Sequence, residues 1–81
     1  MASVYILLSL KDHRTYTGST VDLKVRFLQH QKGKVAATRY RLPVQLMYSE
    51  EFSTLIEARR KEKYYKTAAG RRKMKKILSH L

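Results

Sequence analysis

The 81-residue sequence contains no cysteine, so neither a disulfide nor a zinc–thiolate site can hold its fold together. This absence fits a reducing compartment. The chain also lacks a long apolar stretch, because the run at residues 4–10 is far shorter than the roughly 20 residues that a membrane-spanning helix needs. That run has no basic leader and no small-residue cleavage site, so we expect no signal peptide and a cytoplasmic protein.

Several catalytic signatures are missing as well. The sequence has no glycine-rich phosphate loop, no Ser/His/Asp set and no Cys/His metal spacing. The enzyme classes that depend on these motifs are therefore poorly supported.

Acidic residues are scarce: the sequence has six Asp and Glu and eighteen Lys and Arg, which gives a formal net charge of +12. Self-repulsion of this size destabilises a small compact chain, which indicates a polyanionic partner. Nucleic acid is the first candidate and an anionic membrane surface the second. Binding to nucleic acid should weaken steeply as salt is added. The length leaves room for one core, so residues 1–81 are expected to form a single domain.

The first quarter of the chain predicts a β-hairpin. Residues 3–10 are nearly all apolar and rich in β-branched and aromatic types, which is typical of a central strand buried on both faces. A polar turn at residues 11–14 leads to an antiparallel strand at residues 15–19. Gly18 lies near the end of that strand, where backbone freedom or a close approach is needed.

A helix should follow the hairpin, with Thr20 as its N-cap and its end near Gly33. Leu23 and Phe27 form the buried stripe of this helix. A basic loop at residues 33–42 then connects it to the next strand.

The second half of the chain predicts one more strand and two helices. Pro43 introduces a strand at residues 44–52. Ser53 or Thr54 starts the next helix, and Thr54 with Glu57 fits a capping box.

We expect that helix to run to about Thr67, to be broken by Gly70 and to be followed by a short basic helix at residues 71–80. The order β-β-α-β-α-α predicts an α+β domain whose first two strands are antiparallel.

Three residues near the first helix have the composition of an anion site. Arg26 and His30 lie four residues apart and share one helix face, and Tyr16 precedes the helix. Arg26 and His30 flank the apolar stripe, so we expect them at the edge of the core. This combination indicates the binding of an anionic group, phosphate first of all. The alternative is that Arg26 is a solvated base and His30 a surface histidine favoured by the helix dipole.

Glu62 is a carboxylate on a line that should be buried, because it shares a helix face with Leu55, Ala58 and Tyr65. Burying a charge without a partner is costly. One interpretation pairs Glu62 with a nearby arginine. The other makes it a metal ligand, since Mg²⁺ prefers carboxylate oxygen and often uses only one or two protein carboxylates.

Tyr5 and Tyr16 lie on adjoining strands of the predicted hairpin. Taken alone they are ordinary core or half-buried tyrosines. A tyrosine that acts as a base near pH 7 needs its pKa lowered by about three units from about 10, which corresponds to roughly 4 kcal/mol. A metal ion or an arginine nearby supplies much of that.

Several basic residues are candidate phosphate contacts, although charged runs are usually solvated faces. The net charge raises the chance that at least one cluster binds phosphate. The candidates are Lys32, Lys34, Arg39, Arg41 and Lys66.

Taken in order, these features resemble the GIY-YIG nuclease superfamily from Val4 to about Lys76. The chain is most similar to small single-domain bacterial members, which resemble the N-terminal nuclease domain of a bacterial excision-repair protein. Three positions depart from the name-giving triplets: Ser3, Val4 and Thr17. The matching motifs are Val4-Tyr5-Ile6, Tyr16-Thr17-Gly18, Asp22-Leu23 with Arg26 and His30, a Gly-Lys loop, Leu42-Pro43, Tyr48-Ser49-Glu50, and Glu57-Ala58 through Glu62-Lys63 and Lys66.

The resemblance implies a sheet of three antiparallel strands flanked by helices, one divalent metal ion and hydrolysis of phosphodiester bonds in DNA. The ion would be Mg²⁺, with Mn²⁺ able to substitute. By this resemblance Tyr5 and Tyr16 are the paired tyrosines, one of which activates water. Arg26 would stabilise charge on the phosphate, and His30 would transfer a proton or position a tyrosine. Glu62 would bind the metal ion, and Gly18 would allow close packing beside the site.

We therefore expect a metal-dependent DNA endonuclease that acts on branched or damaged DNA in repair or recombination. The alternatives are a catalytically idle nucleic-acid-binding module on the same fold and a basic protein associated with RNA or ribosomes. The sequence carries no appended DNA-recognition domain, so an accessory protein is one expected source of target specificity.

Overall fold

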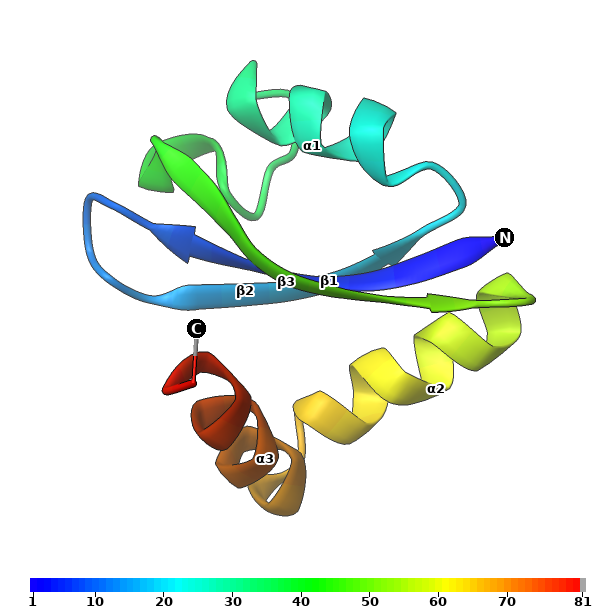
Figure 1. Ribbon diagram of the computed structural model, residues 1–81. Helices are drawn as coiled ribbons and strands as arrows, with labels where there is room; N and C mark the ends of the chain where they lie inside the picture. Colours follow the sequence, from blue (N-terminus) through cyan, green and yellow to red (C-terminus); the bar gives the residue numbers. More distant parts are fainter. Residues whose placement is uncertain (81) are drawn as a thin grey trace.

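Strands and helices follow one another in the order β-β-α-β-α-α in the computed structural model, which describes residues 1–80 (Figure 1). This α+β arrangement confirms the expected fold class. A short 3₁₀ helix, Arg39–Arg41, lies in the loop before the third strand. The elements are β1 (Ala2–Ser9), β2 (Thr15–Thr20), α1 (Leu23–Gln31), β3 (Val44–Phe52), α2 (Leu55–Tyr65) and α3 (Ala68–Leu78).

The three strands form one antiparallel sheet in the order β2-β1-β3, so β1 is the central strand. Alternate side chains of a strand point to opposite faces of the sheet. Val4 and Ile6 therefore enter one hydrophobic cluster, and Tyr5 and Leu7 enter the other. All four are fully buried, which confirms that β1 is covered on both faces.

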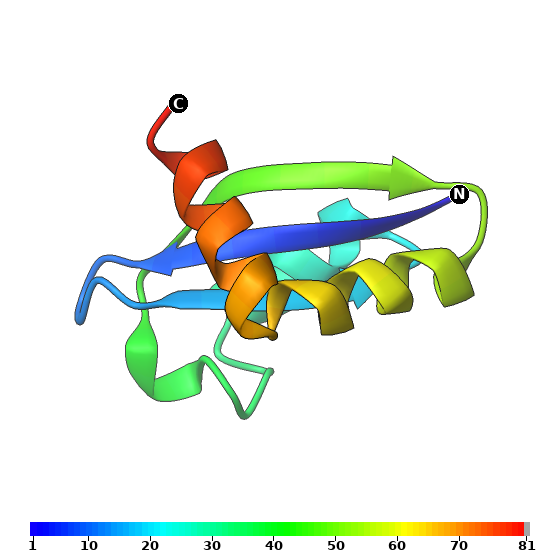
Figure 2. The ribbon, with the colours of Figure 1, turned by 90° about the horizontal axis from the view of Figure 1, so that it is seen from below.

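Helices cover the two faces of the sheet unequally. Figure 1 shows α1 and the loop that follows it on one face, and α2 with α3 on the other. Seen from below in Figure 2, α2 runs along the sheet while α3 crosses it. Burying a Val, Leu or Ile side chain contributes about 1.5–3 kcal/mol, so the residues of β1 stabilise both layers at once. No helix within residues 1–80 is long and apolar enough to cross a membrane.

The N-cap of α1 is Asp22, so the prediction of Thr20 was wrong. The Asp22 carboxylate accepts the backbone N–H of Val25 at 3.2 Å. Thr20 instead accepts the N–H of Asp22 at 3.2 Å and belongs to the turn before the helix. Both residue types can cap a helix, and the turn decides which one reaches the free N–H groups. The predicted end near Gly33 is confirmed, because Gly33 has φ +74°.

The capping residue of α2 is Thr54, as predicted, and its hydroxyl accepts the N–H of Glu57 at 3.2 Å. The helix ends at Tyr65, two residues before the expected end. Thr67 then caps α3 by accepting the N–H of Gly70 at 3.0 Å.

Gly70 does not break a helix, contrary to the prediction, because it lies in the first turn of α3. A Cβ at this position would be 1.8 Å from the carbonyl oxygen of Tyr64 and 2.7 Å from the Cα of Tyr65. The glycine therefore permits the close approach of α3 to the end of α2. The break itself falls at Lys66 and Thr67.

We expect Gly70→Ala to destabilise the protein by about 3 kcal/mol or more, because the atoms in the way belong to the backbone and cannot rotate aside. Urea unfolding would measure this change. Ala69→Gly, an exposed neighbour in the same turn, is the control and should cost only about 0.5–1 kcal/mol. Equal, small effects in the two variants would contradict the close approach.

Candidate active site

Three buried side chains from three segments form a hydrogen-bonded line. The Tyr5 hydroxyl on β1 lies 2.8 Å from Nε2 of His30 on α1. Nδ1 of the same histidine lies 2.7 Å from the hydroxyl of Thr38, in the loop that follows α1. These side chains are 1%, 0% and 1% exposed, respectively. Both ring nitrogens of His30 are thus held, which fixes the orientation of the ring.

His30 is more deeply buried than the expected position at the edge of the core. Desolvation lowers its pKa to about 4, and the positive charge of Arg26 acts in the same direction. The imidazole is therefore neutral at physiological pH, with one nitrogen donating and the other accepting. A neutral ring can exchange a proton with the Tyr5 hydroxyl, whereas a surface histidine has no such fixed partner.

Tyr16 lies beside this line on β2 and is half-buried. The Tyr16 ring is 6.4 Å from the Tyr5 ring and 5.2 Å from the His30 ring, centroid to centroid. Gly18 is on the same face of β2 and directly opposite Tyr5 in the register. A Cβ on Gly18 would be 2.6 Å from the Tyr5 hydroxyl oxygen, so the glycine makes room for the Tyr5 ring.

Tyr5 has a raised pKa. Burial is the largest cause, interaction with the Arg26 side chain opposes it, and the charges of Tyr16 and Glu62 raise the pKa further. Tyr5 is consequently a phenol at neutral pH. The charges of Arg26, Tyr16 and Glu62 thus all affect the pKa of this one buried hydroxyl.

Arg26 is half-buried on the face of α1 that carries His30. Its Nη1 donates to the amide oxygen of Gln29 at 3.1 Å. Arg26 also lines a cavity of about 340 Å³ between the start of α1 and α2, together with Ser19 and Arg59. An anionic group in this cavity would face guanidinium groups from two helices.

Glu62 lies on α2 and contacts β2 from the face of the sheet opposite α1. Its Oε1 accepts the Ser19 hydroxyl of β2 at 2.5 Å, and its Oε2 binds Nζ of Lys66 at 2.8 Å. The partner is therefore a lysine rather than the expected arginine. Burial raises the pKa of Glu62, but the hydrogen bonds from Lys66 and Ser19 and the charges of Lys66 and Arg59 outweigh it and leave the pKa below its usual value.

The chemistry of Glu62 fits a hard divalent cation held through a single carboxylate. Its side chain is ionised and 22% exposed, so it is partly accessible to solvent. Within residues 1–80 there is no group of three or more His, Cys, Asp and Glu side chains that could hold a metal. An ion at Glu62 would take its remaining ligands from water and substrate, as Mg²⁺ commonly does.

The predicted phosphate contacts lie in two separate places. Lys32, Lys34 and Arg39 are exposed around the loop after α1, where the Arg39 guanidinium lies 5.4 Å from the centre of the Tyr40 ring. Arg41 is ion-paired with Asp12 at 3.2 Å. Lys66 lies on the other face of the sheet, bound to Glu62. Only Lys66 contacts a predicted site residue by hydrogen bond or ion pair among the described residues.

Two further residues at the site were not predicted. Thr38 stood in the sequence as one polar residue of a basic loop, and no spacing connects it to His30. Ser19 had a weak signal, because strand alternation places it on the face opposite Gly18. Its contact with Glu62 follows only when α2 is known to cover that face.

Protonation of buried His30 should make the protein less stable in mild acid. Between pH 6.5 and about 4 the unfolded chain binds a proton at this residue that the folded chain does not, so the free energy of unfolding falls as the pH falls through this window. From pH 7 to pH 5 the expected loss is about 2 kcal/mol.

Urea unfolding at the two pH values would measure this loss in wild type and in His30→Gln, which should be nearly insensitive to pH in this range. His13→Asn is the matched control, because His13 is exposed with φ +60°, a conformation that asparagine tolerates. A wild-type stability that stays constant from pH 7 to pH 5 would rule out the buried neutral ring.

Comparison with known proteins shows the family to which the chain belongs. The family model for the GIY-YIG catalytic domain matches residues 1–76. A UPF0213 protein of Streptococcus agalactiae is 42% identical over 80 residues, which cover 98% of this chain and 90% of that protein. One from Staphylococcus haemolyticus is 40% identical over 79 residues, with 95% and 96% coverage.

A solved structure agrees with the fold. The solution NMR structure of the UPF0213 protein BH0048 from Bacillus halodurans is 38% identical and matches with a TM-score of 0.57, covering 98% of this chain and 84% of that one. The catalytic-domain match, the sequence relatives and the shared fold agree. The chain belongs to the GIY-YIG nuclease domain family and is similar along its length to UPF0213 proteins.

Proposed function

We propose that this protein is a metal-dependent endonuclease that hydrolyses phosphodiester bonds in DNA. The observation that carries the proposal is the grouping of the Tyr5, His30 and Tyr16 rings, whose centroids lie 5.2 to 6.4 Å apart. Arg26 lies one helical turn from His30, and Glu62 is hydrogen-bonded to the same edge strand, β2, through Ser19. Phosphodiester hydrolysis needs an activated water, a cation that neutralises the phosphate and a carboxylate that holds a metal ion. These residues supply one candidate for each requirement.

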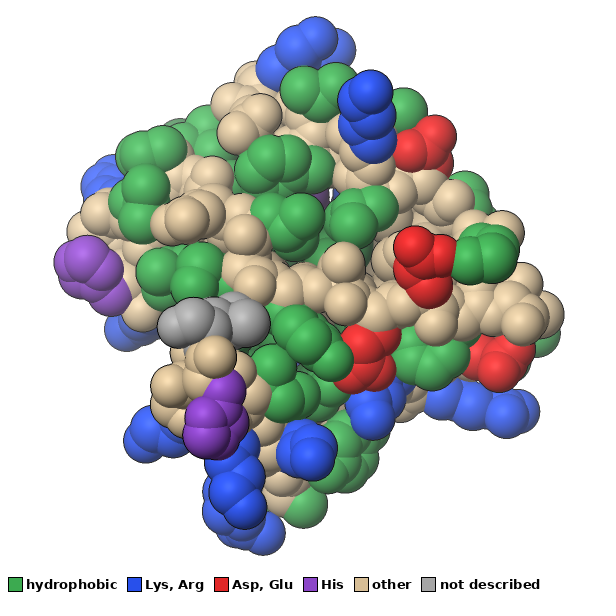
Figure 3. Space-filling model, in the orientation of Figure 1, with side chains coloured by type: hydrophobic (Ala, Val, Ile, Leu, Met, Phe, Trp, Pro, Cys, Tyr) green, Lys and Arg blue, Asp and Glu red, His purple; other side chains and the backbone are tan. Residues whose placement is uncertain are grey.

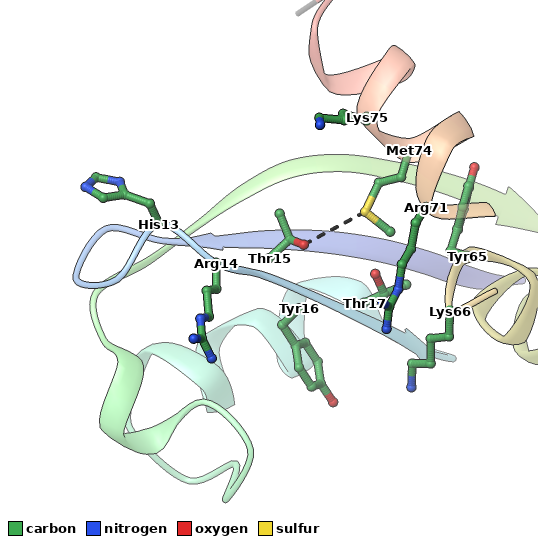
Figure 4. A pocket seen from close by; sticks show the side chains of 10 residues that line it. All are labelled: His13, Arg14, Thr15, Tyr16, Thr17, Tyr65, Lys66, Arg71, Met74 and Lys75. Carbon is green, nitrogen blue, oxygen red and sulfur yellow. Dashed lines mark hydrogen bonds between the residues drawn. The ribbon is translucent and has the colours of Figure 1, made fainter. Parts of the chain in front are cut away.

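Tyr16 is the better candidate for the group that takes the proton from water. Tyr5 is 1% exposed and its hydroxyl is already bound to His30, so it has little room to touch a phosphate. Tyr16 is half-buried, and Figure 4 shows its ring pointing out past β2. Tyr5 and His30 then act as positioning residues, and they hold one wall of the site with a proton shared between them.

Arg26 would bind the phosphate and stabilise the charge that develops on it. Its guanidinium can form two parallel hydrogen bonds to phosphate oxygens, and it already lines a cavity with Arg59. A divalent ion at Glu62, Mg²⁺ with Mn²⁺ able to replace it, would supply Lewis-acid polarisation of the phosphate when bound. Lys66 would release one carboxylate oxygen of Glu62 and remain as a nearby positive charge.

We propose that the substrates are branched or damaged DNA duplexes, which arise during repair or recombination in the cytoplasm. Residues 1–81 would act as a single domain, with an accessory protein contributing target choice. The net charge of +12 supports binding to a polyanion without base-specific contacts.

Replacing the candidate metal ligand should abolish cleavage and spare binding. We expect Glu62→Gln to lower the rate of nicking of supercoiled plasmid in Mg²⁺ by about 10²-fold or more, because a neutral amide holds a hard cation poorly. Chelation of the metal should stop the wild-type enzyme. DNA affinity, measured by fluorescence anisotropy at low salt, should remain within about threefold of wild type.

The matched control is Glu51→Gln, an exposed carboxylate on β3 that should leave nicking unchanged. Full activity in Glu62→Gln would reject the metal assignment. A wild-type protein that binds DNA but cuts neither duplex nor flap nor branched substrates would favour an idle binding module.

Replacing Tyr16 should affect mainly the rate of cleavage, whereas replacing Tyr5 should affect mainly the stability of the protein. Tyr16→Phe should reduce the turnover rate by about 10²-fold or more with little change in stability, because it removes the proposed base. Tyr5→Phe should cost about 1–3 kcal/mol of stability, because it leaves a buried ring nitrogen of His30 without its partner. Single-turnover nicking and urea unfolding of both variants would test this. The reverse pattern would transfer the role of the base to Tyr5.

A further inference from the structure

A second, larger cavity includes Tyr16 and Lys66 but is lined mainly by residues that the proposed function does not use. It has a volume of about 800 Å³ and separates the start of β2 from α3 (Figure 4). Its apolar floor includes Tyr65 and Met74, and Thr15 donates a weak hydrogen bond to the Met74 sulfur at 3.9 Å. We call this cavity the β2–α3 groove.

The rim of the β2–α3 groove is strongly basic. Arg14 comes from the start of β2, Arg71 and Lys75 from α3, and Lys66 from the end of α2. The ion pairs found among residues 1–80 are Arg41 with Asp12 and Lys66 with Glu62. Arg14, Arg71 and Lys75 therefore have no acidic partner within that range. Figure 3 shows the same concentration of Lys and Arg over α3.

The groove shares two residues with the proposed active site at the free edge of the sheet. β2 is an edge strand, because it pairs only with β1. Tyr16 and Lys66 line the groove, and Lys66 binds Glu62. In Figure 4 the side chains of Arg14, Tyr16 and Lys66 extend beyond β2 on the same side, and Arg71 reaches from α3 toward β2. A chain of phosphates that followed this edge would pass the cations and then the Tyr16 hydroxyl.

The burial of α3 argues against a membrane as the occupant. Its apolar residues Met74, Ile77 and Leu78 pack into the cluster of the sheet, so they are not free to enter lipid. The α3 side chains on the rim of the β2–α3 groove are positively charged. Guanidinium groups bind phosphate with two parallel hydrogen bonds, which suits Arg14 and Arg71 to a nucleic acid backbone.

We infer that the β2–α3 groove binds the phosphate backbone of the substrate strand beside the scissile phosphate, with Arg14 on one wall and Arg71 and Lys75 on the other. This inference rests on the proposed nuclease function for its substrate. The groove sets the path of the strand along β2 and its direction of entry toward Tyr16. The contacts are to phosphate, so they carry no base sequence.

The experiment compares two double variants with the same loss of charge, on the same helix and with the same spacing. Arg71→Gln/Lys75→Gln alters the groove, whereas Arg72→Gln/Lys76→Gln alters exposed residues that do not line it. Fluorescence anisotropy would give the affinity for a single-stranded oligonucleotide and for a duplex of equal length across a range of salt. Arg14→Gln tests the opposite wall, and thermal unfolding checks that each variant is folded.

We expect the groove variant to bind about tenfold more weakly, with the slope of log K against log salt reduced by about 2, and the control to stay within about twofold of wild type. Arg14→Gln should weaken binding in the same direction with a slope reduced by about 1. Losses confined to the single strand or to the duplex would identify which form of DNA occupies the groove.

Equal losses in the two double variants, or no loss in either, would overturn the inference, since binding would then follow net charge alone. This result is independent of catalysis, because the readout is affinity. A wild-type protein without nuclease activity would defeat the proposed function and leave the groove measurement valid. A protein that cuts DNA while the groove variant binds and cuts like its control would defeat only the groove.

Discussion

The burial of β1 on both faces is the constraint on which the rest of the structure depends. Val4 and Ile6 need cover on one side, and Tyr5 and Leu7 need it on the other. Helices must therefore pack on both faces of a sheet of only three strands. Because β2 is an edge strand of the sheet, residues from the helical layers on the two faces can approach each other beside it. Arg26 lies on α1 and Glu62 on α2, so the proposed site would draw its residues from both faces of the sheet.

Tyr5 shows how one residue serves both the fold and the site. Its ring fills the core beside Leu7, while its hydroxyl holds His30, which Thr38 holds from the other side. A buried histidine that is neutral and bonded at both nitrogens keeps its ring in place and costs little, provided that both partners remain. Gly18 is part of the same arrangement, since any side chain there would displace the Tyr5 hydroxyl.

The positively charged side chains lie on two different sides of the sheet in the folded protein. Exposed cations of the loop after α1 lie on one side of the sheet, while those of α2 and α3 lie on the other and border a recess beside β2. Several of the six carboxylates are engaged by side chains: Asp12 by Arg41, Glu62 by Lys66, and Glu50 by the hydroxyls of Tyr48 and Tyr65. The free edge of β2 therefore remains open to an anionic partner, in keeping with membership of a nuclease domain family.

The sequence by itself determined the order of the elements, the buried central strand, the Thr54 cap and the family, because these depend on local patterns of apolar and polar residues. Only the tertiary structure decided that Asp22 rather than Thr20 caps α1, that Gly70 lies inside α3, and that His30 is buried against Thr38. It also decided that Glu62 is paired with Lys66 and Ser19. These outcomes depend on which groups meet across segments far apart in the chain, and periodicity within one segment contains no information about its partner.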